Sequence, residues 1–137
     1  MKQATQDDAQ RLIAEAEKDL KDAELLLRYE SYYPLCRLAY LAAEKAMRGW
    51  LVGRGLHVAG QPTLSSLGQQ LEATKPALGP LMRSLRSLER FAPPASAGEP
   101  QGASSPPPLY SREIAKGALG LARQVVIEVK RALAAPS

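Results

Sequence analysis

The sequence predicts an all-α protein, an up-and-down bundle of four to five helices that forms one domain over residues 1–137. Alanine and leucine, two strong helix formers, occur 22 and 21 times, whereas the chain has one Phe and one Trp. Residues that favour strands are scarce, which argues against a strand-rich fold. Apolar residues also recur at three- and four-residue spacing over long segments, which is typical of amphipathic helices.

The first two predicted helices form an antiparallel hairpin. The first helix covers residues 7–28; Thr5 and Asp8 are spaced for a capping box, and acidic residues fill its first half, where the helix dipole favours them. After a tyrosine-rich turn, Pro34 opens the second helix, residues 34–53, at the position where proline is best tolerated. One face of this second helix is rich in small residues and is expected to point inward: Leu35, Ala39, Ala42, Ala46, Gly49 and Gly53.

Three further helices are predicted in the rest of the chain. Thr63 caps a short helix that ends near residue 74, and another short helix covers residues 81–90 after two chain-breaking prolines. Residues 92–108 contain six prolines, and this composition predicts an extended or mobile loop. Ser111 caps the last helix, which ends near residue 134 and is expected to bury Ile114, Ala118, Leu121, Val125, Val129 and Ala132.

The charge of the chain is unevenly distributed. The formal net charge is +4, but residues 1–30 carry eight acids and five bases, whereas the remaining residues carry six acids and thirteen bases. This asymmetry favours either an anionic partner for the basic part or a contact between the acidic and basic surfaces of two copies.

Cysteine and histidine counts limit the chemistry of the chain. One cysteine, Cys36, allows no intrachain disulfide, and one histidine, His57, leaves no Cys/His cluster for zinc. No apolar run is long enough for a membrane span, and the first residues lack the apolar core of a signal peptide. A cytoplasmic protein without cofactors is therefore expected. Cys36 and Trp50 are expected to pack in the core, and His57 has no neighbour placed to complete a catalytic triad.

The last predicted helix carries a basic stripe. Its four residues, which fall within about 40° of one another on a helical wheel, are Arg112, Lys116, Arg123 and Lys130. Such a stripe can follow the phosphates of a nucleic acid. The alternative interpretation is a solvated face opposite the core.

A second basic group lies on the helix predicted over residues 34–53. It combines four bases, the last just beyond the helix, with three nearby tyrosines: Arg37, Lys45, Arg48, Arg54, Tyr32, Tyr33 and Tyr40. Tyrosine rings can stack on bases or guanidinium groups, so this group is a candidate nucleotide or phosphate site. Glu44 and Arg48 are spaced for an ion pair. The competing interpretation is a face covered in a dimer, because Leu41 and Leu51 lie on the same polar side.

The hairpin resembles the HEPN domain family. Members typically show an Ala-Ala-Glu-Lys-Ala core on their second helix, and residues 42–46 reproduce it, with Glu44 and Lys45 as the signature pair. Arg90-Phe91-Ala92-Pro93 is similar to the Arg-Tyr-Pro that often follows the fourth helix, and Tyr110 stands at the start of the last helix. The resemblance extends over about residues 9–133.

The resemblance implies a helical bundle that commonly forms homodimers and acts with a small nucleotidyltransferase as a toxin and antitoxin pair. Some members bind nucleotides, and others are metal-independent ribonucleases that use Arg, four to six residues, then His. In this chain His57 follows Arg54 by two intervening residues and Arg48 by eight, so that motif cannot be placed. Three hypotheses follow: a non-catalytic nucleotide- or RNA-binding domain, a ribonuclease with a divergent site at His57, and a purely structural interaction module.

Overall fold

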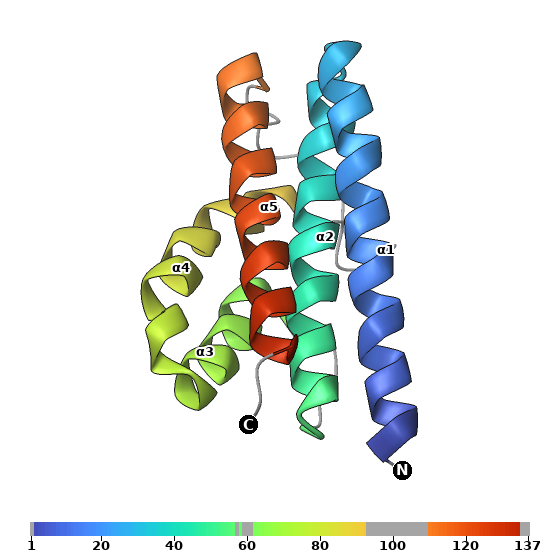
Figure 1. Ribbon diagram of the computed structural model, residues 1–137. Coiled ribbons are helices and arrows are strands. Elements are labelled where there is room, and N and C mark those ends of the chain that lie inside the picture. Colours follow the sequence, from blue (N-terminus) through green and yellow to red (C-terminus); the bar gives the residue numbers. More distant parts are fainter. Residues whose placement is uncertain (1, 57, 59–61, 93–109, 135–137) are drawn as a thin grey trace, which may run out of the picture.

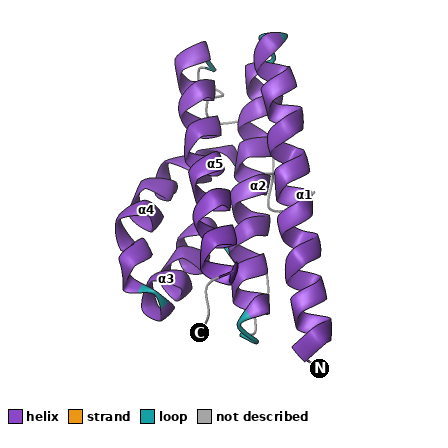
Figure 2. Ribbon diagram, in the orientation of Figure 1, coloured by secondary structure: helices purple, strands orange, loops and turns teal. Residues whose placement is uncertain are grey.

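The computed structural model describes residues 2–56, 58, 62–92 and 110–134, and every regular element among them is helical (Figure 1, Figure 2). The predicted all-α class is confirmed. Apart from Ala92, the predicted loop at residues 92–108 lies outside the described residues. The elements are α1 (Lys2–Arg28), α2 (Tyr32–Gly53), α3 (Leu64–Thr74), the 3-10 helix η1 (Pro76–Leu78), α4 (Gly79–Ser84), the 3-10 helix η2 (Leu85–Phe91) and α5 (Arg112–Ala134).

Helix α2 is the centre of the bundle. Figure 1 shows α1, α2 and α5 as three long helices side by side, with α3 and α4 on the side of the bundle away from α1. Helix α2 contacts α1, α5, α3 and η2. Trp50 is 1% exposed, which confirms its predicted place in the core, and Cys36 is also buried. The outer helices therefore bury their apolar stripes against one central helix.

The small-residue seam of α2 lets its neighbours approach closely. The three alanines of the seam are fully buried: Ala39, Ala42 and Ala46. A Cβ added at Gly49 would lie 3.3 Å from the backbone oxygen of Ala9 in α1. A Cβ added at Gly53 would lie 2.8 Å from Cδ2 of Leu133 in α5. The predicted inward face of this helix is thus confirmed, because both neighbours occupy the space that larger side chains would need.

The turn between α1 and α2 is closed by backbone hydrogen bonds. Glu30 lies in the left-handed region at φ 58°. The amide of Ser31 donates to the carbonyl of Leu26, and the amide of Glu30 donates to the carbonyl of Leu27. This pair of bonds is the Schellman arrangement that ends many helices. The hairpin is therefore set by local chain geometry as well as by packing.

Two helix starts differ from the prediction. Helix α1 begins at Lys2, so Thr5 lies inside the helix and not at a cap. Helix α2 begins at Tyr32, which makes Pro34 its third residue. Proline is tolerated there because the amides of the first turn have no partner inside the helix.

The middle of the chain is more continuous than predicted. Thr63 caps α3 as expected, and its hydroxyl accepts from the amide of Ser66. Pro76 and Pro80 do not break the chain into a loop; Pro76 starts η1, and Pro80 lies in the first turn of α4. The predicted helix over residues 81–90 becomes α4 followed by η2. Proline in a first turn removes only an amide that has no helical partner.

The cap of α5 is confirmed, but its buried face is rotated from the predicted one. Ser111 Oγ accepts from the amide of Ile114. Ile114 and Leu121 are only half-buried. The buried residues of the helix are Ala115, Ala118, Leu119, Ala122, Val125, Val126, Val129 and Ala132. Small and β-branched residues face α2 because the two helices pack closely.

Two features are absent from the described residues. No helix there has an apolar stretch long enough to cross a membrane. No group of three or more His, Cys, Asp or Glu side chains there is placed to hold a metal ion.

Candidate functional site

Aromatic rings and guanidinium groups meet where α2 begins, where η2 ends and just before α5. We call Tyr33, Arg37, Arg90, Phe91 and Tyr110 the tyrosine–arginine cluster. Arg37 Nη1 donates to Tyr33 Oη at 2.7 Å, and its Cζ lies 5.5 Å from the centroid of that ring. The Tyr33 and Tyr110 rings meet edge to face, with centroids 4.9 Å apart. These contacts hold one guanidinium against the Tyr33 ring, which itself packs against the Tyr110 ring.

The second guanidinium of the cluster belongs to Arg90. Its Cζ lies 4.8 Å from the centroid of the Phe91 ring, and Phe91 lies 5.8 Å from Tyr110 between centroids. Burial raises the pKa of Tyr110, with Tyr33 and Cys36 raising it further, while Arg37 and Arg90 lower it. Both guanidinium groups thus lower the pKa of the same phenol. Neither forms an ion pair with any described carboxylate. The cluster joins segments that are far apart in the sequence.

Cys36 lies close to this cluster, and its thiol is a poor nucleophile. It is fully buried. Burial raises the pKa of its thiol from 9.0 to about 11, against a smaller lowering by Arg90. The nucleophilic thiolate is therefore scarce at neutral pH, in line with the predicted packing role.

A second polar group lies further along the same face of α2. Tyr40 is 5% exposed, and burial raises its pKa, with Glu44 and Glu89 raising it further and Arg48 lowering it. Glu89 Oε1 accepts from the amide of Ser65 at 2.9 Å, which ties η2 to the first turn of α3. Arg48 Nε is buried without a hydrogen-bond partner among the described residues.

Two expectations for this face of α2 are not met, a Glu44–Arg48 ion pair and an exposed Leu51. No N–O distance of 4.0 Å or less joins Glu44 and Arg48 in the described structure, so the predicted ion pair is absent. Both side chains are half-buried, and both act on the buried Tyr40: Glu44 raises the pKa of its phenol and Arg48 lowers it. Leu51 is fully buried and Leu41 is half-buried against the core, because the monomer itself covers this side of α2. Leu51 therefore cannot contribute to a dimer contact.

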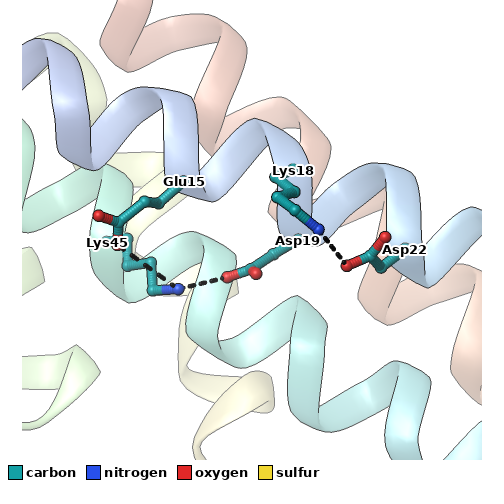
Figure 3. Close-up of polar contacts among 5 residues, drawn as sticks. All are labelled: Glu15, Lys18, Asp19, Asp22 and Lys45. Atoms are coloured by element: carbon teal, nitrogen blue, oxygen red, sulfur yellow. Dashed lines mark hydrogen bonds and ion pairs between the residues drawn. The ribbon is translucent and has the colours of Figure 1, made fainter.

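Lys45 points away from the other predicted site residues. Its Nζ lies 2.9 Å from Oδ2 of Asp19 and 3.9 Å from Oε1 of Glu15, both on α1 (Figure 3). The adjacent Glu44 lies at the η2 side, where it raises the pKa of Tyr40. The two signature residues therefore face different neighbours of α2: Lys45 contacts α1, whereas Glu44 faces the η2 side. The positive charge of Lys45 is neutralised by carboxylates of α1.

The basic stripe of α5 has one half that pairs with acids of α1 and one half that does not. Arg123 Nη2 lies 3.0 Å from Oε2 of Glu24, and Lys130 Nζ lies 2.7 Å from Oε2 of Glu17, so acids of α1 cover the lower half of the stripe. Arg112 and Lys116 are exposed and form no ion pair with the described residues. They lie in the first turns of α5, just after Tyr110. The free part of the stripe is thus the part next to the tyrosine–arginine cluster.

The structure brings only some of the predicted site residues together. Arg37 belongs to the cluster, Arg112 follows it closely in the chain, and Arg48 lies along the same face of α2. Sequence reasoning did not place Arg90 or Tyr110 in a site, although both stand in segments that resemble family motifs. His57 lies outside the described residues.

Comparisons with known proteins agree with this architecture. The sequence model of the HEPN domain matches residues 9–132. A crystal structure of an archaeal HEPN homologue is similar, with a TM-score of 0.69 and 22% sequence identity over 91% of this chain and 97% of that one. The search of curated proteins found no match. Because the family model spans most of the chain and the helices superpose on those of a homologue, this protein belongs to the HEPN domain family.

Proposed function

We propose that this HEPN domain binds the phosphate of a nucleotide or of RNA at the tyrosine–arginine cluster, and that it does so without catalysing a reaction. The observation that carries the proposal is the pair Arg37 and Arg90, two guanidinium groups free of ion pairs with described carboxylates and held against aromatic rings. A planar guanidinium matches the oxygens of a phosphate and is weakly hydrated, so it binds such anions well.

The surroundings of the cluster suit the remainder of a nucleotide. Tyr33 is 46% exposed, and we propose that its ring offers surface on which a base can stack. Arg112 and Lys116 extend the positive charge along α5 and could contact further phosphates of a longer RNA. Binding of this kind weakens as salt rises, because each phosphate contact releases a bound counterion.

The proposal is for a binding domain because the ribonuclease pattern of the family is not present in the sequence. Its only histidine, His57, is separated from Arg54 by two intervening residues instead of four to six. General acid–base chemistry near neutral pH usually relies on a histidine held by a partner.

We further propose that the domain acts with a small nucleotidyltransferase in a toxin and antitoxin pair. The support is family membership together with the Glu44–Lys45 signature. The test is to co-express the protein with the product of the neighbouring reading frame. Co-purification with an adjacent nucleotidyltransferase would support the partnership, and an unrelated neighbour that does not bind would contradict it.

Binding is tested with labelled ATP and a short single-stranded RNA at about 50 and 200 mM salt. We expect at least one of the two to bind, more tightly at the lower salt, and Arg37→Gln to weaken that binding. Arg86→Gln is the matched control, because Arg86 is exposed on η2 and forms no ion pair with the described residues. Absence of binding at both salt concentrations would refute the proposal.

A further inference from the structure

The polar groups of the tyrosine–arginine cluster are mainly hydrogen-bond donors. A guanidinium carries N–H donors and no acceptor. Tyr33 Oη already accepts from Arg37 Nη1, so its own hydrogen is left to donate, and no described residue accepts it. Tyr110 contacts Tyr33 and Phe91 through its ring, and its hydroxyl has no hydrogen-bond partner among the described residues. The cluster therefore presents two guanidinium groups and two phenol O–H groups to a ligand.

The positive charge of the cluster is not offset by acids in the described part of the chain. Arg37 and Arg90 both lower the pKa of Tyr110, so both lie near that phenol, and no carboxylate is among the described groups that shift this pKa. Glu89 stands next to Arg90 in the chain, but its Oε1 accepts from the amide of Ser65 at 2.9 Å. Two positive charges thus act at one phenol.

The cluster is open to solvent on its polar side and anchored on its apolar side. Arg90 and Tyr33 are exposed, and Arg37 and Tyr110 are half-buried. Phe91 is 3% exposed and packs in the core. Figure 1 shows α2 and α5 beginning at the same end of the bundle. A ligand can therefore reach the donors, and partial burial strengthens the charge-assisted hydrogen bonds that they form.

The phosphates of a nucleic acid are of two kinds, which differ in charge and in acceptor oxygens. A phosphodiester within the strand carries a single negative charge, and two of its oxygens are bonded to sugars. A terminal phosphate monoester carries a charge of about −1.5 to −2 at pH 7 and has three strong acceptor oxygens. A site with two guanidinium groups and two further donors matches the monoester better, both in charge and in the number of acceptors.

We propose that the tyrosine–arginine cluster selects a terminal phosphate monoester over the phosphodiesters of a strand, an inference that rests on the phosphate site of the proposed function. Arg37 and Arg90 pair with the charge of the monoester, and the phenols of Tyr33 and Tyr110 donate to its oxygens. The exposed Arg112 and Lys116 of α5 are left for phosphodiesters further along the strand. The same monoester occurs at the 5′ end of an RNA and in a free nucleoside monophosphate.

The first test titrates the full chain with two single-stranded RNAs of one sequence at about 50 mM salt, one with a 5′-phosphate and the other with a 5′-hydroxyl. We expect the phosphorylated RNA to bind at least about tenfold more tightly, as one charge-assisted hydrogen bond gives. Adenosine 5′-monophosphate and adenosine, used as competitors, make the same comparison for a free nucleotide.

A preference for the phosphorylated member of either pair supports the proposal and shows which source of the monoester binds. Equal binding within both pairs would overturn this inference and leave the proposed function standing. If none of the four probes binds, the proposed function and this inference both fail.

The second test measures the preference, the ratio of the two dissociation constants of a pair, in variants of the cluster. Arg90→Gln should lower it by about tenfold, and Tyr110→Phe, which keeps the ring but loses one O–H donor, by about threefold. Arg112→Gln is the matched control, because it should weaken both RNAs equally and leave their ratio unchanged. A ratio that both cluster variants leave unchanged, or that Arg112→Gln abolishes, would overturn the proposal. Circular dichroism shows whether each variant has folded.

Discussion

Lys45 of α2 binds Asp19 of α1 across the helical hairpin, with 2.9 Å between Nζ and Oδ2. The two side chains are 28% and 14% exposed, which makes this the least exposed ion pair in the described part of the chain. Glu15 adds a second carboxylate at 3.9 Å. The lysine of the family signature therefore joins the two helices of the hairpin.

Replacing Lys45 by Met should destabilise the protein by about 1–2 kcal/mol, because Asp19 would lose its partner in a half-buried place. The measurement is urea denaturation at neutral pH. Lys18→Met is the control, since Lys18 and Asp22 form an exposed pair that should contribute less than about 0.5 kcal/mol. Equal losses of stability in the two variants would show that the Lys45–Asp19 pair stabilises the protein no more than the exposed Lys18–Asp22 pair does.

Gly49→Ala should destabilise the protein by about 1–3 kcal/mol, because the added Cβ meets backbone and side-chain atoms of α1 at 3.2–3.3 Å. Gly68→Ala provides the comparison: its added Cβ would lie 3.4 Å from Met82 Cβ, which is ordinary contact. We expect little change there, or a small gain from helix propensity. Thermal unfolding of both variants tests the close approach of α1 to α2.

Alkaline pH should destabilise the protein through Cys36. The folded state raises the pKa of the thiol from 9.0 to about 11, so the folded state holds the proton more tightly than the unfolded chain. The resulting stabilisation is complete below pH 9 and is lost as the pH rises through about 11, by roughly 2 kcal/mol. Denaturation at pH 8 and pH 10.5 should show a smaller loss in Cys36→Ala than in the wild type. An equal loss in both proteins would contradict this assignment.

The double change Glu17→Gln and Glu24→Gln should increase the binding of RNA. These acids of α1 now cover Lys130 and Arg123, and their removal would leave a longer basic strip on α5. Stability should change by less than about 1 kcal/mol, because both pairs are exposed. RNA binding at low salt is the measurement. Unchanged binding would mean that the lower half of the stripe does not reach the ligand.

Much of the fold was predictable because helices depend on local patterns. Thr63 and Ser111 are caps in both sequence and structure, and the small residues of α2 face inward as their spacing indicates. The rotation of the α5 face was not predictable from a list of large apolar residues. Close packing against α2 selects Ala115 and Ala122 over the bulkier Ile114, and that choice depends on the distance between two helices.

The candidate site was less predictable because its residues meet only in three dimensions. Arg37 was identified from its charge and its neighbouring tyrosines. Arg90 and Tyr110 come from segments separated by many residues, so their meeting depends on the path of the chain. The acidic first helix did indicate a contact with basic residues. The structure shows such contacts within the chain itself, at Lys45, Arg123 and Lys130.

In the proposed site, Arg37 and Arg90 bind one phosphate group together. It is tested by titrating labelled ATP or RNA, whichever binds the wild type, into Arg37→Gln, Arg90→Gln and the double variant at low salt. We expect each single change to weaken binding by about tenfold and the double change to weaken it less than the product of the two, because both groups contact the same ligand. Binding that neither change alters more than the control Arg86→Gln would contradict a phosphate site at Arg37 and Arg90.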